Sequence, residues 1–209
     1  MANDYSTSTD AFADISEGGY SSSDYPQMAG FVTTASRLID REFGRWDGFF
    51  YPTTDTKTYY YDGSGEAVQE IDEFASIAAV LVSEQGSLAS TDYTTWTENT
   101  DYITKPYNAA NKGKPITHLE IVSYNGTKGA WYGGQKSVQV QGIPGYSTTT
   151  PAVIEHATRM QATRWFMRAK AGYQDTGATA ELGGLTFRSR LELDPDIKQL
   201  LHGLKLELS

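Results

Sequence analysis

The side chains best suited to catalysis or metal binding are few and scattered in this sequence. His118, His156 and His202 are the only histidines, and none has a second histidine or an acid at metal-ligand spacing except Glu155, next to His156. Adjacent residues do not face each other on a helix, so we interpret the three histidines as ordinary surface or partly buried residues. The chain has no cysteine, which excludes disulfides, thiolate metal sites and cysteine nucleophiles. We therefore expect no metal, no other cofactor and no enzyme activity.

Acidic and glycine-rich stretches give two weaker signals. Glu70, Asp72 and Glu73 form a cluster beside a predicted strand. A carboxylate pair for glycoside hydrolysis has to lie across a cleft, so we interpret the cluster as a solvated edge and keep a hydrolase as an alternative. The glycines at 133–134 and the segment 142–145 lack the phosphate-loop spacing and the Lys-Ser/Thr that follows it, so we expect no nucleotide site.

Aromatic residues gather at two places in the middle of the chain. Tyr59, Tyr60 and Tyr61 are consecutive, and Trp131 precedes Tyr132. Such side chains can stack on a sugar or a base. We prefer sheet packing and subunit contact, and a carbohydrate-binding β module remains the alternative.

The elements that position these residues begin with an amphipathic helix within residues 22–43. Ser23 or Asp24 can cap its start, and Gly44 is placed to end it. Apolar residues recur at helical three- and four-residue steps and need a partner surface; they are Met28, Phe31, Val32, Ala35, Leu38, Ile39 and Phe43.

A row of arginines shares a second face of this helix. Arg37, Arg41 and Arg45 are four residues apart, and Trp46 follows the row. The row either forms weak pairs with neighbouring acids on a solvated face or forms ion pairs with a neighbouring subunit. We leave both interpretations open and take these four residues as the candidate subunit interface.

Between about residues 56 and 145 the pattern changes to short strands. The segment Asp62–Gly65 is typical of a hairpin turn between two strands, and Ile77–Ser83 is a candidate buried strand. Further strands are expected near residues 92–104, 118–123 and 136–142. Their number and spacing favour a small antiparallel sandwich or barrel.

Helical patterns return at Pro151 and continue to about Gly172. A glycine-rich segment, Gln174–Arg190, precedes a final helix that opens at Leu193-Asp194-Pro195. The last residues alternate at period two, with Leu204, Leu206 and Leu208, which predicts an extended strand. This strand either packs on its own domain or adds to a partner's sheet edge, and we favour the partner.

Together these patterns predict an α+β protein. We expect a helical bundle formed by sequence-distant helices, an inserted antiparallel β domain and an extended C-terminal tail. The predicted divisions are 1–23 (N-terminal arm with a short helix), 24–55 (long helix and turn), 56–145 (β domain), 146–192 (second bundle helix and glycine-rich segment) and 193–209 (C-terminal helix and partner-docking tail).

Composition limits the partners of the chain. The 209 residues carry a net charge of −9, whereas a free-standing nucleic-acid binder would usually be basic. An acidic surface fits a wall that lets DNA pass without holding it. No apolar run approaches the roughly 20 residues that span a bilayer, and the N-terminus lacks the basic start and apolar core of a signal peptide.

The order of the motifs resembles the head–tail connector (adaptor) proteins of long-tailed bacteriophages. Three patterns carry the resemblance: AS-x-x-ID followed by G-R, V-x-G-x-x-G-Y with P-x-x-I-x-x-A, and LDPD-I-x-x-L near the end. Their main residues are Ala35, Ser36, Ile39, Asp40, Gly44, Arg45, Val140, Gly142, Gly145, Tyr146, Pro151, Ile154 and Ala157. The sequence departs from the family mainly in a long insertion around residues 91–134.

The resemblance implies a homo-oligomeric ring, usually of twelve copies, beneath the portal protein in the virion neck. It implies that the ring, assembled in the host cytoplasm, lines the DNA channel and contacts a downstream connector, stopper or tail-terminator protein. It implies no catalysis and no membrane partner. In the family the C-terminal tail reaches the portal, so the candidate portal-docking residues are Ile197, Leu200, Leu201, Leu204, Leu206 and Leu208.

Overall fold

The computed structural model describes residues 3–15, 20–84, 92–124, 126–171 and 192–208, with side chains described as far as Lys205 in the last segment. The chain divides into two compact units, residues 1–48 with 151–209 and residues 49–150. The described helices of eight residues or more lie in the first unit and an antiparallel sheet forms the second, so the fold class is α+β. The predicted glycine-rich segment Gln174–Arg190 lies outside the described residues.

The second unit starts earlier and ends later than the predicted range 56–145. Phe49, Phe50 and Tyr146 form an aromatic group, with ring centroids 4.8 Å apart for the two phenylalanines and 5.4 Å apart for Phe50 and Tyr146. The Phe49 carbonyl also accepts a hydrogen bond from the Tyr146 N–H at 3.0 Å. The two ends of the segment 49–150 therefore meet through packing and through the backbone.

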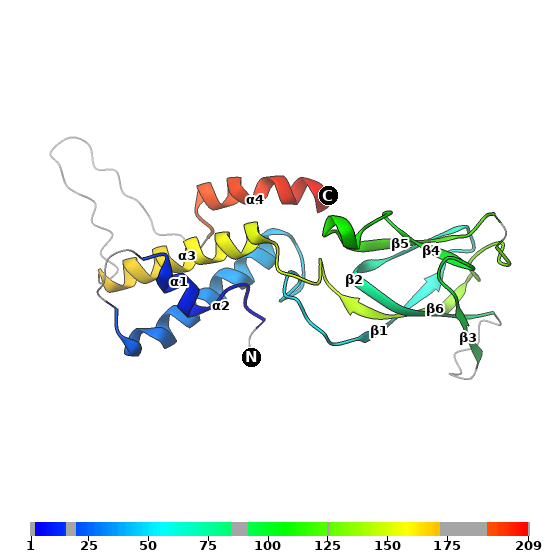
Figure 1. The fold of residues 1–209 in the computed structure, drawn as a ribbon, viewed down its shortest axis with the longest axis horizontal. Helices are drawn as coiled ribbons and strands as arrows, with labels where there is room; N and C mark the ends of the chain where they lie inside the picture. Colours follow the sequence, from blue (N-terminus) through cyan, green and yellow to red (C-terminus); the bar gives the residue numbers. More distant parts are fainter. Residues whose placement is uncertain (1–2, 16–19, 85–91, 125, 172–191, 209) are drawn as a thin grey trace. The chain divides into compact units, whose positions relative to one another are not determined.

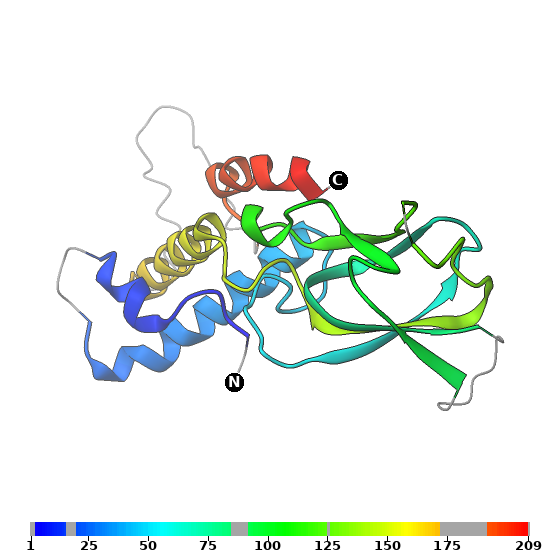
Figure 2. The same cartoon turned by 45° about the vertical axis from the view of Figure 1, so that its right-hand side comes forward.

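The helical unit contains α1 (Ser8–Ala13), the 3-10 turn η1 (Ser22–Asp24), α2 (Tyr25–Glu42), α3 (Ala152–Lys170) and α4 (Pro195–Leu208). Helix α2 ends because Gly44 adopts φ +65°, which lets the Arg45 N–H return to the Asp40 carbonyl at 2.9 Å. Helices α2 and α3 lie side by side, as Figures 1 and 2 both show, and α4 contacts α3.

A shared core joins α1, α2 and α3. Phe12 from α1 meets Phe166 from α3 edge-on, with ring centroids 5.0 Å apart. Each such side chain contributes about 1.5–3 kcal/mol when it is fully buried. The buried residues of this core are Ala11, Phe12, Met28, Val32, Ala162 and Phe166. Segments about 150 residues apart in sequence therefore stabilise one another.

The predicted C-terminal strand is wrong, because residues 204–208 continue helix α4. Leu204 and Leu208 are four residues apart, and Ile197 and Leu201 have the same spacing, so the leucines fit a helical stripe as well as an alternating strand. The pattern spans only five residues and follows a helix directly, which favours continuation of that helix. The side chains of Leu206 and Leu208 lie outside the described residues.

The second unit is one six-stranded antiparallel sheet. Its strands are β1 (Lys57–Gly63), β2 (Val68–Ser83), β3 (Tyr93–Trp96), β4 (Tyr102–Lys105), β5 (Ile116–Ile121) and β6 (Gly134–Pro144). The strand order is β1-β6-β2-β5-β4, and β3 also pairs with β2.

The predicted hairpin between β1 and β2 is wrong, although its turn is present. Gln69 closes this turn, accepting from the Ser64 N–H at 2.8 Å and donating to the Asp62 carbonyl at 3.2 Å. Strand β1 pairs with β6, and the first half of β2 pairs with β5. Turn residues therefore predict where the chain reverses but not which strand becomes the hydrogen-bonded neighbour.

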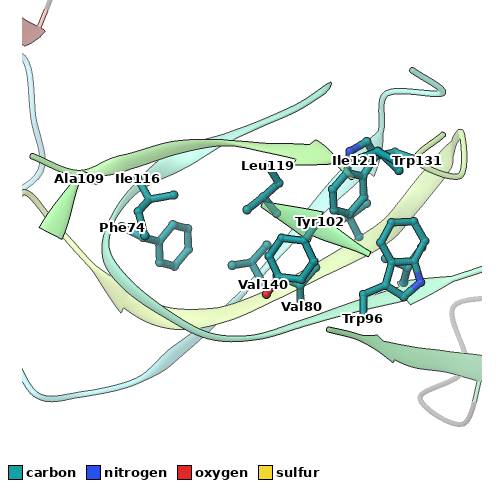
Figure 3. Close-up of a cluster of buried hydrophobic side chains, with 12 residues drawn as sticks. Phe74, Val80, Trp96, Tyr102, Ala109, Ile116, Leu119, Ile121, Trp131 and Val140 are labelled. Carbon is teal, nitrogen blue, oxygen red and sulfur yellow. The ribbon is translucent and has the colours of Figure 1, made fainter. Parts of the chain in front are cut away.

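Strand β2 bends over the core of the sheet, with register shifts at 70–74, 74–76 and 77–79. Its first half pairs with β5, and its second half pairs with β6 and β3. Figure 3 shows the core side chains between strands of the two halves. The expected sandwich or barrel is thus realised as a single bent sheet, with Phe74, Val80, Leu119 and Val140 among its fully buried residues.

Candidate functional site

The three histidines lie apart from one another. His118 is on β5, with Nε2 4.0 Å from Glu70 Oε1, whereas His156 on α3 and His202 on α4 are exposed. Within the described segments, no group of three or more His, Cys, Asp or Glu side chains could hold a metal ion. The same segments contain no helix long and apolar enough to cross a membrane.

The acidic cluster follows β2 along the surface of the sheet. The Glu70 side chain is 89% exposed, and Asp72 Oδ2 accepts a hydrogen bond from the Tyr61 hydroxyl at 3.0 Å. Burial raises the pKa of Tyr61 above its ordinary value, so this hydroxyl remains a donor at neutral pH. Asp72 therefore contacts β1, and Glu70 lies near His118 of β5.

Trp131 belongs to the core rather than to a sugar-binding surface. It is 1% exposed and stacks on Trp96 with ring centroids 4.7 Å apart, while its Nε1 donates to the Ala67 carbonyl at 3.2 Å. Tyr60 is 51% exposed. Trp131 is therefore not accessible to a sugar, and of the aromatic residues considered for carbohydrate binding only exposed tyrosines remain.

The predicted arginine row divides into residues with different surroundings. Arg37 donates to the Asn3 carbonyl at 2.5 Å and lies over the Tyr5 ring, 5.6 Å from its centroid, so it binds the N-terminal segment of its own chain. Arg45 is half-buried, whereas Arg41 and Trp46 are exposed. A role at a subunit interface stays a prediction for all four residues, and Arg41 and Trp46 are the accessible ones.

A buried polar network that the sequence did not reveal lies beside this row. Asp40 is fully buried and accepts hydrogen bonds from the Tyr5 hydroxyl and from the Gly48 N–H, the latter at 3.0 Å. Burial raises the pKa of Asp40, and these two donors together with Arg37, 3.5 Å away, oppose that rise. Ser36 accepts from the Tyr5 N–H at 3.1 Å.

The signal for this network was present in the helical pattern. Ser36 and Asp40 fall four residues apart, each next to a buried apolar residue of α2 (Ala35 and Ile39), where a solvated residue would not be expected. Two polar residues on a buried stripe indicate a partner segment that supplies hydrogen bonds. That partner is the N-terminal segment around Tyr5.

The candidate docking residues of α4 also differ in exposure. Ile197 and Leu201 are 0% and 1% exposed and are therefore buried within their own chain, whereas Leu200 is 39% exposed and Leu204 is half-buried. Ile197 and Leu201 therefore stabilise the fold. Among the candidate docking residues whose side chains are described, Leu200 and Leu204 are the accessible ones. Portal docking stays a prediction for them.

Arg164 of α3 fixes the start of α4. It donates to Asp196 at 2.8 and 2.5 Å and to Asp194 at 3.0 Å. This bidentate pairing lowers the pKa of Asp196 to about 2. The Asp194 N–H in turn donates to Gln161 Oε1 at 2.9 Å. The acids of the LDPD pattern thus bind α3.

A groove of about 320 Å³ adjoins α2 and the start of α4. Leu38 and Leu193 are apolar parts of its lining, and Arg41, Glu42, Glu192 and Lys198 are charged parts. Glu42 also pairs with Lys205 of α4 at 2.8 Å. The groove carries both charge signs, so it is not a dedicated anion or cation site.

Comparisons with known proteins add one structural likeness. No protein-family model matches the chain, and no curated protein matches it. One similar solved structure is the neck of an empty GTA particle computed with C6 symmetry, where GTA denotes a phage-like gene transfer agent. The likeness covers 92% of this chain and 87% of that chain at 9% identity, with a TM-score of 0.48. A likeness of this degree does not decide the function.

Proposed function

We propose that this protein is a structural head–tail adaptor of a tailed phage. Copies of the chain form a ring, of twelve subunits by family resemblance, beneath the portal protein. The ring extends the DNA channel and joins head to tail through a downstream connector, stopper or tail-terminator protein. The proposal assigns the protein no catalytic step and places it in the virion neck.

The observation that carries this proposal is the structural role of the residues in the three sequence patterns. Asp40 binds the N-terminal segment and the turn at Gly48, and Asp194 and Asp196 bind Arg164. Gly142 lies where an added Cβ would be 2.4 Å from the Ser76 carbonyl oxygen. The resemblance therefore involves residues that the fold needs, and these residues extend over most of the chain.

The distribution of charge supports a wall that DNA passes without binding. The basic residues of α3 are paired with acids of the same unit. Arg159 pairs with Asp14 at 3.4 Å, Arg168 with Asp194 at 3.6 Å and Lys170 with Asp24 at 2.6 Å. Ion pairs within the chain do not change its net charge of −9. An acidic surface whose basic side chains are already paired with acids binds DNA phosphates weakly.

Reconstitution with a purified portal tests the proposal. We expect the protein to bind the portal as a closed ring, which mass measurement and electron microscopy would detect. A protein that stays monomeric and does not bind the portal contradicts the proposal.

Leu200 offers a sharper test of the portal-docking surface. Leu200→Asp should weaken portal binding at least tenfold, because it places a charge on the accessible face of α4. Met167→Asp is the matched control, since Met167 is 46% exposed on α3 of the same unit. Equal loss in both variants would indicate general destabilisation, and no loss in Leu200→Asp would remove α4 from the docking surface.

A further inference from the structure

A pocket of about 460 Å³ lies in the β unit, and its lining contains none of the candidate interface or portal-docking residues. The lining consists of residues 127–133, which we call the pocket loop, together with Gly65 from the turn between β1 and β2 and Glu84, which follows β2. Small-molecule sites typically have volumes of about 300–1,000 Å³. The pocket is therefore large enough for a small molecule.

The pocket loop is fixed to the rest of the sheet near both of its ends. The Thr127 hydroxyl donates to Asp101 Oδ1 at 2.9 Å, and the Tyr132 carbonyl accepts from the Ser137 hydroxyl at 2.6 Å. Between these bonds, the buried Trp131 lies at one end of the core of the sheet (Figure 3). A loop that is already ordered loses little conformational entropy when a ligand binds, so the pocket loop forms a preorganised wall.

Small residues leave the backbone of the pocket loop accessible. Gly129, Ala130 and Gly133 are exposed, and all three line the pocket. A Cβ added at Gly129 would have no heavy atom of the described residues within 4 Å, so packing within the described part of the chain does not explain a glycine at this position. Glycine does let a ligand approach the main chain closely. The open space at position 129 also makes it possible to fill the pocket by substitution.

One ion pair supplies the charged groups of the pocket. Lys128 Nζ lies 2.9 Å from Glu84 Oε1, and the two side chains are 24% and 37% exposed. An ammonium group has three donors and a carboxylate has two acceptor oxygens, so each partner has hydrogen-bonding capacity left over. The hydrogen bond to Glu84 raises the pKa of Lys128, so the amine stays charged at neutral pH. The pocket therefore presents a donor beside an acceptor, and the charges of its lining cancel.

Tyr132 adds an aromatic side chain to this polar lining. It is 40% exposed, and an exposed ring can stack on the apolar face of a sugar ring. A cation would be repelled by Lys128 and an anion by Glu84, which favours an uncharged ligand. Neighbouring hydroxyl groups of a sugar both donate and accept hydrogen bonds, which matches the donor and the acceptor of this ion pair. We propose that the pocket binds a neutral saccharide.

Glycan-array binding followed by calorimetric titration tests the inference. The probe is an array that carries neutral oligosaccharides and the sialylated or sulfated forms of the same oligosaccharides, incubated with the full chain. We expect the strongest signals from neutral oligosaccharides and weaker signals from their acidic forms. An array on which no neutral oligosaccharide binds overturns the inference, as does binding that is confined to the acidic forms.

Two substitutions show whether a bound oligosaccharide occupies this pocket. Tyr132→Ala removes the exposed ring, and Gly129→Leu fills the open space at the pocket loop. Each should raise the Kd for the oligosaccharide about tenfold or more, because a stacking contact or the space for the ligand is lost. Tyr124→Ala is the control, since Tyr124 is 84% exposed in the same unit and does not line the pocket, and it should leave the Kd unchanged.

Circular dichroism verifies that each variant is folded, and Tyr132→Ala decides alone if Gly129→Leu does not fold. A Kd that is unchanged in Tyr132→Ala, or raised equally in Tyr124→Ala, overturns the inference. The outcome is separate from that of the adaptor proposal. Oligosaccharide binding by a protein that stays monomeric with the portal would contradict only the adaptor function, whereas a ring on the portal without oligosaccharide binding would contradict only this inference.

Discussion

Asp40 joins three parts of the helical unit through one residue. Its side chain accepts from Tyr5 and from Gly48, and its main-chain carbonyl accepts from Arg45. The N-terminal segment, α2 and the turn after α2 therefore depend on a single buried residue. Burial of a carboxylate is costly, and the donors around it offset that cost.

Removing this carboxylate should destabilise the helical unit. Asp40→Ala leaves the Tyr5 hydroxyl and the Gly48 N–H without this acceptor, so we expect a loss of about 2–3 kcal/mol in the free energy of unfolding. Tyr5→Phe removes one donor and should cost about 1 kcal/mol. Urea unfolding followed by circular dichroism measures both. The double variant should lose less than the sum of the two losses, because the pair is coupled; strict additivity would contradict the network.

The pairing of Asp196 with Arg164 makes stability depend on acid. The pKa of Asp196 is about 2 in the folded chain, against an ordinary value of 3.8. Its stabilising contribution is thus complete above about pH 4 and is lost as the pH falls towards 2. The side chain is 54% exposed, so solvent screening limits the contribution to about 1 kcal/mol or less.

Asp196→Asn should flatten this part of the pH dependence. We expect the Tm of the variant to fall less than that of the wild type between pH 4 and pH 2, as measured by thermal unfolding. Asp47→Asn, at an exposed carboxylate of the same unit, is the control. If both variants follow the wild-type curve, the ion pair does not contribute to stability in acid.

At the scale of elements, the helices were the more predictable part. Apolar residues at three- and four-residue steps located α2, and capping and breaking residues set its ends close to Tyr25 and Glu42. The sheet was harder, because β2 is one strand of 16 residues, whereas the sequence pattern predicted only Ile77–Ser83 as a buried strand and placed a separate strand before it. Strands β5 and β6, which pair with β2, are distant from it in the sequence. Short-range sequence patterns do not specify such pairing.

The C-terminal segment illustrates how a short pattern misleads. Three alternating leucines predict a strand, yet the same residues extend α4. Ile197 and Leu201, predicted for docking, are buried instead, because an amphipathic helix turns one stripe inward. The exposure of each side chain in the folded chain distinguishes residues that can dock to a partner from residues that pack in the core. The sequence pattern alone does not specify which stripe of the helix packs against the rest of the chain.

A glycine within α4 gives a test of its helical end. An added Cβ at Gly203 has no heavy atom within 4 Å, so Gly203→Ala should stabilise the helix by about 0.5–1 kcal/mol. Amide hydrogen exchange should become slower over residues 204–208. Gly30→Ala in α2, where the space is equally open, is the matched control for a helical glycine. Stabilisation by Gly30→Ala alone would contradict a helix that reaches Leu208.

At the scale of the whole molecule, the chain combines a helical unit closed by distant segments with a β unit inserted between them. The return of helical periodicity after residue 145 predicts a change from strands to helix there, and the two compact units divide at 48–49 and 150–151. The surfaces that meet other chains were less predictable. A subunit interface can form only from side chains that are still exposed after the chain has folded. The sequence alone does not specify which side chains become buried by contacts within the chain.

Arg41 tests whether the accessible part of the arginine row meets acids of another copy. It is exposed and lies on the groove beside α2, whereas Arg37 binds Asn3 of its own chain. If Arg41 pairs with an acid of a neighbour, Arg41→Glu should impair ring formation on the portal more than Arg41→Gln. The difference between the variants should be larger at low salt, because ions screen charges beyond about 10 Å at 0.1 M. Mass photometry across a salt series measures this difference, and Arg37→Gln is the control for an arginine that acts within its own chain. Equal ring formation by Arg41→Glu and Arg41→Gln at every salt concentration would show that Arg41 faces solvent in the ring, which would leave Trp46 as the accessible residue of this set to test.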